Sequence, residues 1–134
     1  MPFYPDKYSM LFRLLNYEPT SYEDALMHVI RHDYANVISF RALLYKNVKI
    51  TNLPALPLEK YPEFKGHVNE KSVKGLCRLN TIISAMKKDV DYYNRLVSLK
   101  ESNHFDEKQH NIKMLSVKSA LEREMSLAER VIGR

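Results

Sequence analysis

Several residue types are scarce or missing in this sequence of 134 residues. Glycine occurs only three times, which disfavours nucleotide-binding α/β folds because their phosphate-binding loops depend on glycine. Cys77 is the one cysteine, so the chain cannot form an internal disulfide. Because Cys77 falls inside a predicted helix, we expect a small, inert packing residue in a protein of a reducing compartment.

Long apolar runs are also missing. No stretch approaches the roughly 18 uncharged apolar residues that a membrane span requires, and residues 1–10 lack the basic start and apolar stretch of a secretion signal. We therefore expect a soluble, cytoplasmic protein with no membrane contact. Apolar residues make up 45% of the chain and charged residues 28%, which is typical of one folded domain that buries a core.

The clearest pattern lies between Ser72 and Ser102, where seven apolar residues alternate three and four positions apart, as in the seam of a helix that packs on another helix. Ser72 is the expected N-cap of this helix. Asp106 and Gln109 have capping-box spacing and begin a second helix that runs to about residue 132. A loop of about five residues separates the two helices, so they must lie antiparallel. The seam residues are Leu76, Leu79, Ile83, Met86, Val90, Tyr93 and Val97.

The N-terminal half predicts shorter helices. One helix opens near Pro5 and ends near Asn16, and the next begins at Ser21 and follows one apolar face to about Tyr45. Asp33 would fall on that apolar face, so we expect a kink or break around residues 32–33, because an unpaired buried charge is costly. The sequence therefore predicts an all-α fold in which short N-terminal helices pack on a long antiparallel C-terminal helical hairpin.

A proline-rich segment joins the two halves. Pro54, Pro57 and Pro62 predict an extended path through residues 48–70. The first two form a PxxP motif of the kind that aromatic grooves bind, but the flanking leucines favour packing under a loop. We expect one helical domain over residues 1–134. Its parts are short helices in 1–47, the extended connector in 48–70 and the hairpin in 71–134.

Residues suited to catalysis or metal binding do not form a recognisable motif. His28 and His32 lie four positions apart and would share a helix face, but no Glu follows the first histidine and no third ligand is placed. Serines lack a glycine-rich elbow, and carboxylates occur singly or beside basic residues, so no acid–base pair is nominated. We expect a non-enzymatic protein with no catalytic, metal or cofactor site.

The first hairpin helix carries more apolar surface than one seam uses. The seam covers an arc of about 80°, and a second apolar stripe lies beside it. A free two-helix hairpin would leave that stripe exposed, so the N-terminal half or another subunit must cover it. The leading hypothesis is a helical interaction protein that self-associates, as a homodimer or higher oligomer, or docks on a partner protein through its hairpin. The residues predicted to bind the partner are Ile82, Tyr92, Leu96 and Leu99.

Two other functions remain open. Residues 59–100 contain nine basic and five acidic residues of a chain whose formal charge is +5. The alternative is therefore a nucleic-acid-binding regulator or packaging factor that uses a basic helix face, although the interleaved acidic residues favour an ordinary solvated face. A third function is a small inhibitor or chaperone with an adaptable surface of Met86, Met114 and Met125. The residues predicted to bind nucleic acid are Lys74, Arg78, Lys88 and Arg95.

Overall fold

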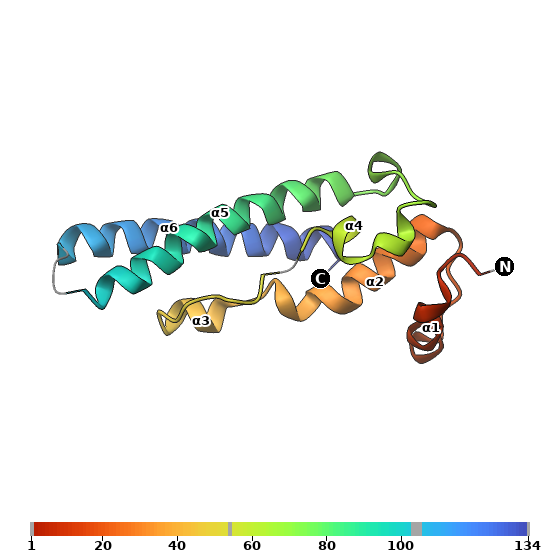
Figure 1. Cartoon of the computed structure of the whole chain (residues 1–134), viewed down its shortest axis with the longest axis horizontal. Helices are drawn as coiled ribbons and strands as arrows, with labels where there is room; N and C mark the ends of the chain where they lie inside the picture. Colours follow the sequence, from red (N-terminus) through yellow and green to blue (C-terminus); the bar gives the residue numbers. More distant parts are fainter. Residues whose placement is uncertain (1, 54, 103–105, 134) are drawn as a thin grey trace.

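The predicted all-α fold is confirmed by the computed structural model, which describes residues 2–53, 55–102 and 106–133. Within these residues all regular structure is helical, and two long helices pack against each other behind shorter ones (Figure 1). In chain order the elements are the 3-10 helix η1 (Asp6–Tyr8), α1 (Ser9–Leu15), α2 (Tyr22–Val37), α3 (Arg41–Tyr45), α4 (Pro57–Lys60), the 3-10 helices η2 (Pro62–Phe64) and η3 (Glu70–Ser72), α5 (Leu76–Lys100) and α6 (Glu107–Val131).

Of the two hairpin helices, α6 begins where predicted and α5 does not. Asp106 caps α6 as predicted, because its side chain accepts a hydrogen bond of 3.2 Å from the backbone N–H of Gln109. The prediction that Ser72 caps α5 is wrong. Ser72 ends η3 in a capping box with Asn69, and α5 begins only after Gly75, which has a left-handed φ of +84°. Val73, whose backbone is extended, and a turn at residues 74–75 separate η3 from α5. Residues 103–105 of the predicted loop lie outside the described residues.

The N-terminal helices begin as predicted, but the break comes later. The side chain of Ser21 accepts a hydrogen bond from the backbone N–H of Asp24, so Ser21 is the N-cap of α2. The expected break at residues 32–33 is wrong, since α2 continues to Val37. Asp33 is tolerated within the helix because it is only half-buried and accepts a hydrogen bond of 2.5 Å from the hydroxyl of Tyr61.

The connector is held against the rest of the chain by side chains that bind its backbone. Asn94 of α5 accepts from the N–H of Ile50 and donates to the carbonyl of the same residue, each at 2.9 Å. Pro57 and Pro62 begin α4 and η2, so the connector is less extended than predicted; proline suits the first helical position, where no N–H is needed. Pro54 lies outside the described residues. The leucines beside the PxxP motif pack on the core, as the packing interpretation expects: Leu53, Leu56 and Leu58.

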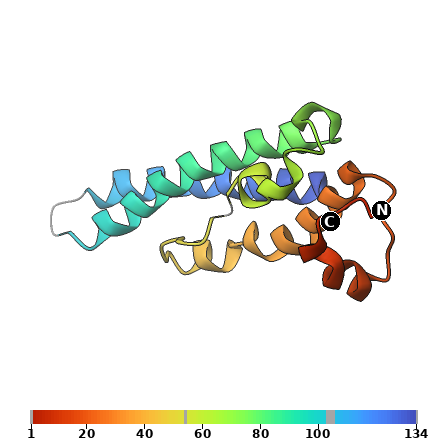
Figure 2. The same ribbon diagram turned by 45° about the vertical axis from the view of Figure 1, so that its right-hand side comes forward.

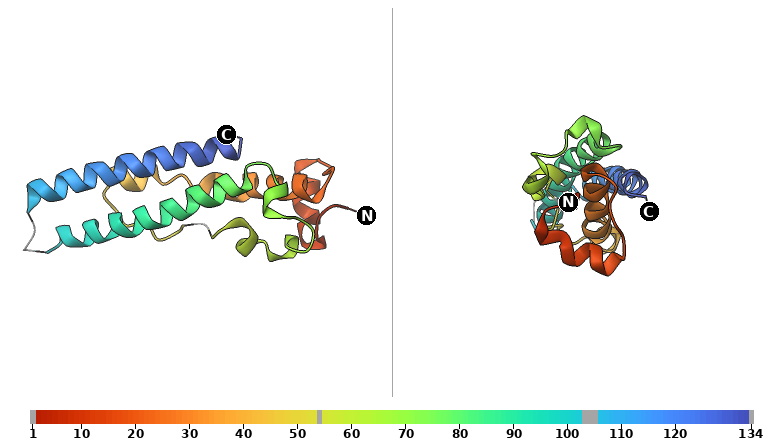
Figure 3. Two further views of the ribbon diagram at one scale, coloured as in Figure 1. Left: turned by 90° about the horizontal axis from the view of Figure 1, so that it is seen from above. Right: turned by 90° about the vertical axis from the view of Figure 1, so that its right-hand side faces the viewer.

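A continuous apolar core joins the N-terminal helices, the connector and the hairpin. Figure 2 shows α2 lying along the hairpin, and the two views of Figure 3 show α5 and α6 side by side. Met86, Met114 and Met125 are buried in this core, so the expected adaptable methionine surface is wrong. Among the described residues, no helix combines the length and apolar character that crossing a lipid bilayer requires.

Candidate functional site

The second apolar stripe of α5 is only partly exposed. Ile82 and Leu96 are buried in the core of the chain itself, so the prediction that they contact a partner is wrong. Tyr92 and Leu99 keep 37% and 44% of their surface exposed. The exposed part of the stripe is therefore narrower than predicted and lies in the C-terminal half of α5.

Two of the predicted nucleic-acid-binding residues share this exposed face. Lys88 and Arg95 are exposed and fall with Tyr92 and Leu99 within an arc of about 60° around the helix. The guanidinium carbon of Arg95 lies 6.0 Å from the centroid of the Tyr92 ring. The outer stripe of α5, as we call these four residues, thus combines two large apolar side chains with two cations.

A groove of about 790 Å³ lies beside the outer stripe. Arg95 and Leu99 belong to both the stripe and the groove, while Lys49 of the connector and Asn94 contribute to the other walls. Because Asn94 binds the backbone of Ile50, the groove follows the line where the connector meets α5. Its lining combines one apolar side chain, Leu99, with polar groups, and the cations Lys49 and Arg95 outnumber the single carboxylate, Asp91.

A second hollow lies where α2 and α5 begin and α6 ends, three helix ends that Figure 1 and the left view of Figure 3 place near one another. This junction pocket has a volume of about 600 Å³. Its walls carry four cationic and two acidic side chains: Arg31, Lys74, Arg78, Arg130, Glu23 and Asp24.

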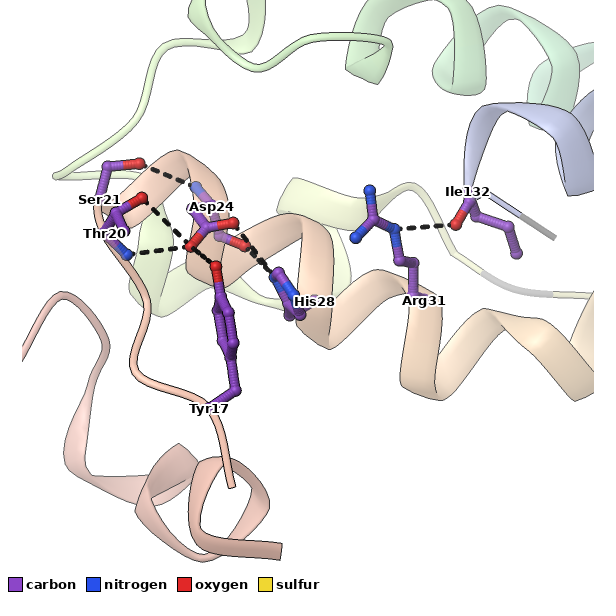
Figure 4. A network of polar contacts seen from close by, with 7 residues as sticks. All are labelled: Tyr17, Thr20, Ser21, Asp24, His28, Arg31 and Ile132. Atoms are coloured by element: carbon purple, nitrogen blue, oxygen red, sulfur yellow. Dashed lines mark hydrogen bonds and ion pairs between the residues drawn. The ribbon is translucent and has the colours of Figure 1, made fainter. Parts of the chain in front are cut away.

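The acidic side of the junction pocket is tied down by local hydrogen bonds (Figure 4). Asp24 accepts from the hydroxyl of Tyr17 at 2.7 Å and from the backbone N–H of Thr20 at 2.9 Å. Partial burial alone would raise the pKa of Asp24, but these hydrogen bonds outweigh it and hold the pKa below its ordinary value. Glu23 accepts from the hydroxyl of Ser72 at 3.3 Å.

Of the two histidines considered for metal binding, His28 belongs to this network instead. The Nδ1 atom of His28 lies 2.9 Å from the carbonyl oxygen of Asp24 and 3.3 Å from its carboxylate, and the ring stacks on Tyr17 (Figure 4). His32 is exposed. In the part of the chain that the structure describes, no group of three or more His, Cys, Asp or Glu side chains could hold a metal ion.

The basic side of the junction pocket is anchored at one residue only. The Nε atom of Arg31 donates to the carbonyl of Ile132 at 2.9 Å, which fixes the guanidinium at the end of α6 (Figure 4). The side chains of Lys74, Arg78 and Arg130 are exposed and make no hydrogen bond or ion pair within residues 2–53, 55–102 and 106–133.

The structure therefore divides the predicted nucleic-acid-binding residues between two places. Lys74 and Arg78 line the junction pocket. Lys88 follows Arg78 by ten residues, about 15 Å along the helix, and Arg95 lies further on. Arg31 and Arg130 were missed because they come from other helices, and no local pattern connects them with the start of α5.

Sequence reasoning also missed two polar residues inside the hairpin. Glu124 is buried; burial, and then the neighbouring carboxyl group of Asp89 in α5, raise its pKa to about 8. His110 is buried with its Nε2 atom 2.7 Å from the carbonyl oxygen of Leu96. The sequence held a signal for both residues, because they continue the alternating four- and three-residue spacing of the α6 seam: His110, Met114, Val117, Leu121, Glu124 and Ala128.

Cys77 lies in α5 as predicted but is exposed rather than packed in the core. It falls between the buried residues Leu76 and Leu79, and its Sγ atom lies 3.6 Å from the carbonyl oxygen of Glu70. The expected packing role is therefore wrong, because a position next to a seam residue points away from the seam.

Comparison of the chain with protein-family models, with curated proteins and with solved structures finds no match. No activity, ligand or partner is therefore carried over from a relative. The fold is all-helical, and it carries two accessible candidate sites, the outer stripe of α5 and the junction pocket.

Proposed function

We propose that the chain is a non-enzymatic interaction protein that self-associates through its hairpin, with the outer stripe of α5 receiving helix α1 of a second copy. The observation that supports this proposal is the exposure of Tyr92 and Leu99 between the cations Lys88 and Arg95. Exposed apolar side chains grouped with charges of one sign are typical of a surface that binds a partner of the opposite sign.

Helix α1 has the complementary chemistry. Met10 and Leu14 are 65% and 77% exposed and lie four residues apart, so they share a face. Asp6 precedes this face by one turn and Glu18 follows the helix, and both are exposed. Residues 2–20 carry two acidic groups, Asp6 and Glu18, and two basic ones, and one of the two cations, Lys7, is already paired with Glu63 at 2.6 Å.

The two surfaces cannot meet within one molecule. Helix α1 lies at one end of the long axis, and the C-terminal end of α5 lies at the other (Figure 1). The contact is therefore intermolecular and joins different surfaces of the two copies. Such a head-to-tail interface leaves one free surface at each end, so it extends into chains or closes into a ring.

Two charge-introducing variants test the proposal by light scattering coupled to gel filtration. Wild-type protein should show a mass that rises with concentration, whereas Leu99→Asp and Met10→Asp should each be monomeric. An equimolar mixture of the two variants should form a dimer, because each variant retains one intact surface. Ile112→Asp is the matched control, since Ile112 is an exposed apolar residue on α6 outside both surfaces.

Three outcomes would reject head-to-tail association: a monomeric wild type at high concentration, unchanged association of Leu99→Asp, or a mixture of variants that stays monomeric. The last result, with each single variant monomeric, would instead indicate a symmetric interface, because both copies then need both residues.

The alternative function, nucleic-acid binding, would use the same face. Tyr92 between Lys88 and Arg95 combines an aromatic platform with phosphate-binding charges. Fluorescence anisotropy of a labelled single-stranded oligonucleotide at two salt concentrations tests it. Affinity that falls steeply with salt and is lost in Arg95→Glu would favour it, and affinity indifferent to salt would reject phosphate contacts as its source.

A further inference from the structure

We infer that the junction pocket is a binding site for a small anion with two or more phosphate groups. Four cationic side chains from three parts of the chain line this pocket: Arg31 from α2, Lys74 and Arg78 at the start of α5, and Arg130 from α6. Three of them make no ion pair or hydrogen bond in the described part of the chain.

The start of α5 adds a second source of positive potential. The N-terminal end of a helix carries partial positive charge, which acidic residues or a side-chain cap normally offset. Helix α5 has neither: its N-cap is Gly75, and its first turn contains no acidic residue. The chain instead places Lys74 and Arg78 there, which opposes helix stability unless an anion is bound.

Backbone donors at this helix start are also available. The N–H groups of Cys77 and Arg78 have no hydrogen-bond partner among the described residues, since the bonds of the first turn begin at Leu76 and Leu79. Exposed N–H groups at the start of a long helix bind phosphate oxygens readily.

The two carboxylates in the pocket do not neutralise these cations. Asp24 is engaged by Tyr17, Thr20 and His28, and Glu23 by Ser72, so neither forms an ion pair with the basic wall. The six charged side chains sum to +2. Glu23 and Asp24 repel anions from their side of the pocket. A phosphate group is therefore expected to bind at the basic wall.

The size and rigidity of the site favour a small ligand. A volume of about 600 Å³ lies in the range of small-molecule sites. Arg31 is held by the carbonyl of Ile132 and packs against Gly133, so its guanidinium is already in position. Arginine binds phosphate through paired N–H groups, and arginine supplies three of the four cations here.

Isothermal titration of the full-length protein with pyrophosphate tests the inference. Wild type should bind with one site per chain and more tightly than it binds inorganic phosphate. Arg78→Ala and Arg130→Ala should each weaken binding at least about fivefold, which corresponds to about 1 kcal/mol for one lost charge-assisted contact. Arg78→Lys should weaken it less than Arg78→Ala does. Lys113→Ala, an exposed lysine of α6 outside the pocket, should leave binding unchanged.

Several results would overturn the site. These are the absence of binding at millimolar pyrophosphate, an equal loss in Lys113→Ala, or binding of a single-stranded oligonucleotide without any binding of pyrophosphate. Circular dichroism of each variant checks that the helices form. Repeating the titration with the Met10→Asp variant separates the two proposals, because that substitution blocks the proposed self-association and leaves the pocket intact.

Discussion

Helices α2 and α5 both begin at the junction pocket, but their first turns carry charges of opposite sign near the positive end of the helix dipole. Helix α2 has a serine cap, and Glu23 and Asp24 lie in its first turn where the helix dipole favours negative charge. Helix α5 has an uncapped start flanked by Lys74 and Arg78. Glu23 and Asp24 each accept hydrogen bonds, whereas the side chains of Lys74 and Arg78 have no partner in the described residues.

The difference separates charges that stabilise the fold from charges that do not. At the α2 start, Ser21 and Asp24 stabilise the fold, because their side chains accept hydrogen bonds from the backbone N–H groups of Asp24 and Thr20. The residues of the α5 start do not contribute to helix stability, and this local conflict is what marks them as candidates for binding.

Glu124 extends this contrast to the interior of the hairpin and should give the largest effect. Its pKa in the folded chain is about 8, against an ordinary value of 4.5, so the folded state binds the proton more tightly than the unfolded state. Stability from this group is complete below about pH 4.5 and is lost as the pH rises toward about 8, by at most about 1.4 kcal/mol per pH unit.

The measurement is urea denaturation of wild type and Glu124→Gln across that pH range. Glutamine keeps the shape without the ionisation, so the difference in unfolding free energy between the two proteins should grow with pH in favour of the variant. A difference that does not change with pH would show that Glu124 ionises normally.

Gly75 at the α5 start should give the next largest effect. Its φ of +84° is unfavourable for any residue with a Cβ, and an added Cβ would lie 3.1 Å from the Cγ1 atom of Val131. Gly75→Ala should therefore lower the free energy of unfolding by about 1–2 kcal/mol, measured by thermal or urea denaturation. Gly66→Ala is the matched control, because Gly66 has no positive φ and nothing within 4 Å of the added Cβ. Equal effects of the two substitutions would contradict this account.

The serine cap of α2 should contribute less. Ser21→Ala removes the acceptor of the 3.0 Å hydrogen bond from the backbone N–H of Asp24 and should cost about 1 kcal/mol of unfolding free energy. Ser119→Ala, on the exposed face of α6, is the control and should change stability little. If both variants unfold at the same urea concentration, the first turn of α2 does not depend on its cap.

The smallest expected effect is an increase in the free energy of unfolding. Arg78→Glu places a favourable charge in the first turn of α5 and should raise stability by about 0.3–1 kcal/mol at low salt, and less at high salt. Glu23→Arg at the start of α2 should lower stability by a similar amount. A loss of stability in Arg78→Glu, without any anion present, would mean that Arg78 has a structural role that the contacts do not show.

Local signals in the sequence were sufficient for the hairpin and for the starts of α2 and α6. The seam spacing of α5 and the caps at Ser21 and Asp106 each depend on residues within a few positions of one another. The break in α2 was misplaced because Asp33 finds its partner in Tyr61, 28 residues away. The start of α5 was misplaced because Ser72 has its own small turn, which ends before the left-handed Gly75.

The candidate sites were less predictable for the same reason. Lys74 and Arg78 were identified from charge alone, but their meeting with Arg31 and Arg130 depends on how three helix ends converge. Likewise, the helix period placed Leu96 and Leu99 near each other, yet only packing decides that Leu96 is buried and Leu99 is not. Glu124 is different: it was missed, although its heptad position alone indicates a core residue.

The buried polar residues of α6 give the hairpin something that its apolar seam lacks. A seam that repeats every seven residues fits almost as well after α6 slides along α5 by one repeat, about 10 Å. Such a slide would carry His110 away from the Leu96 carbonyl and Glu124 away from Asp89. These two polar contacts therefore fix the register of the hairpin, because they favour one pairing of the helices over others that would bury similar apolar surface.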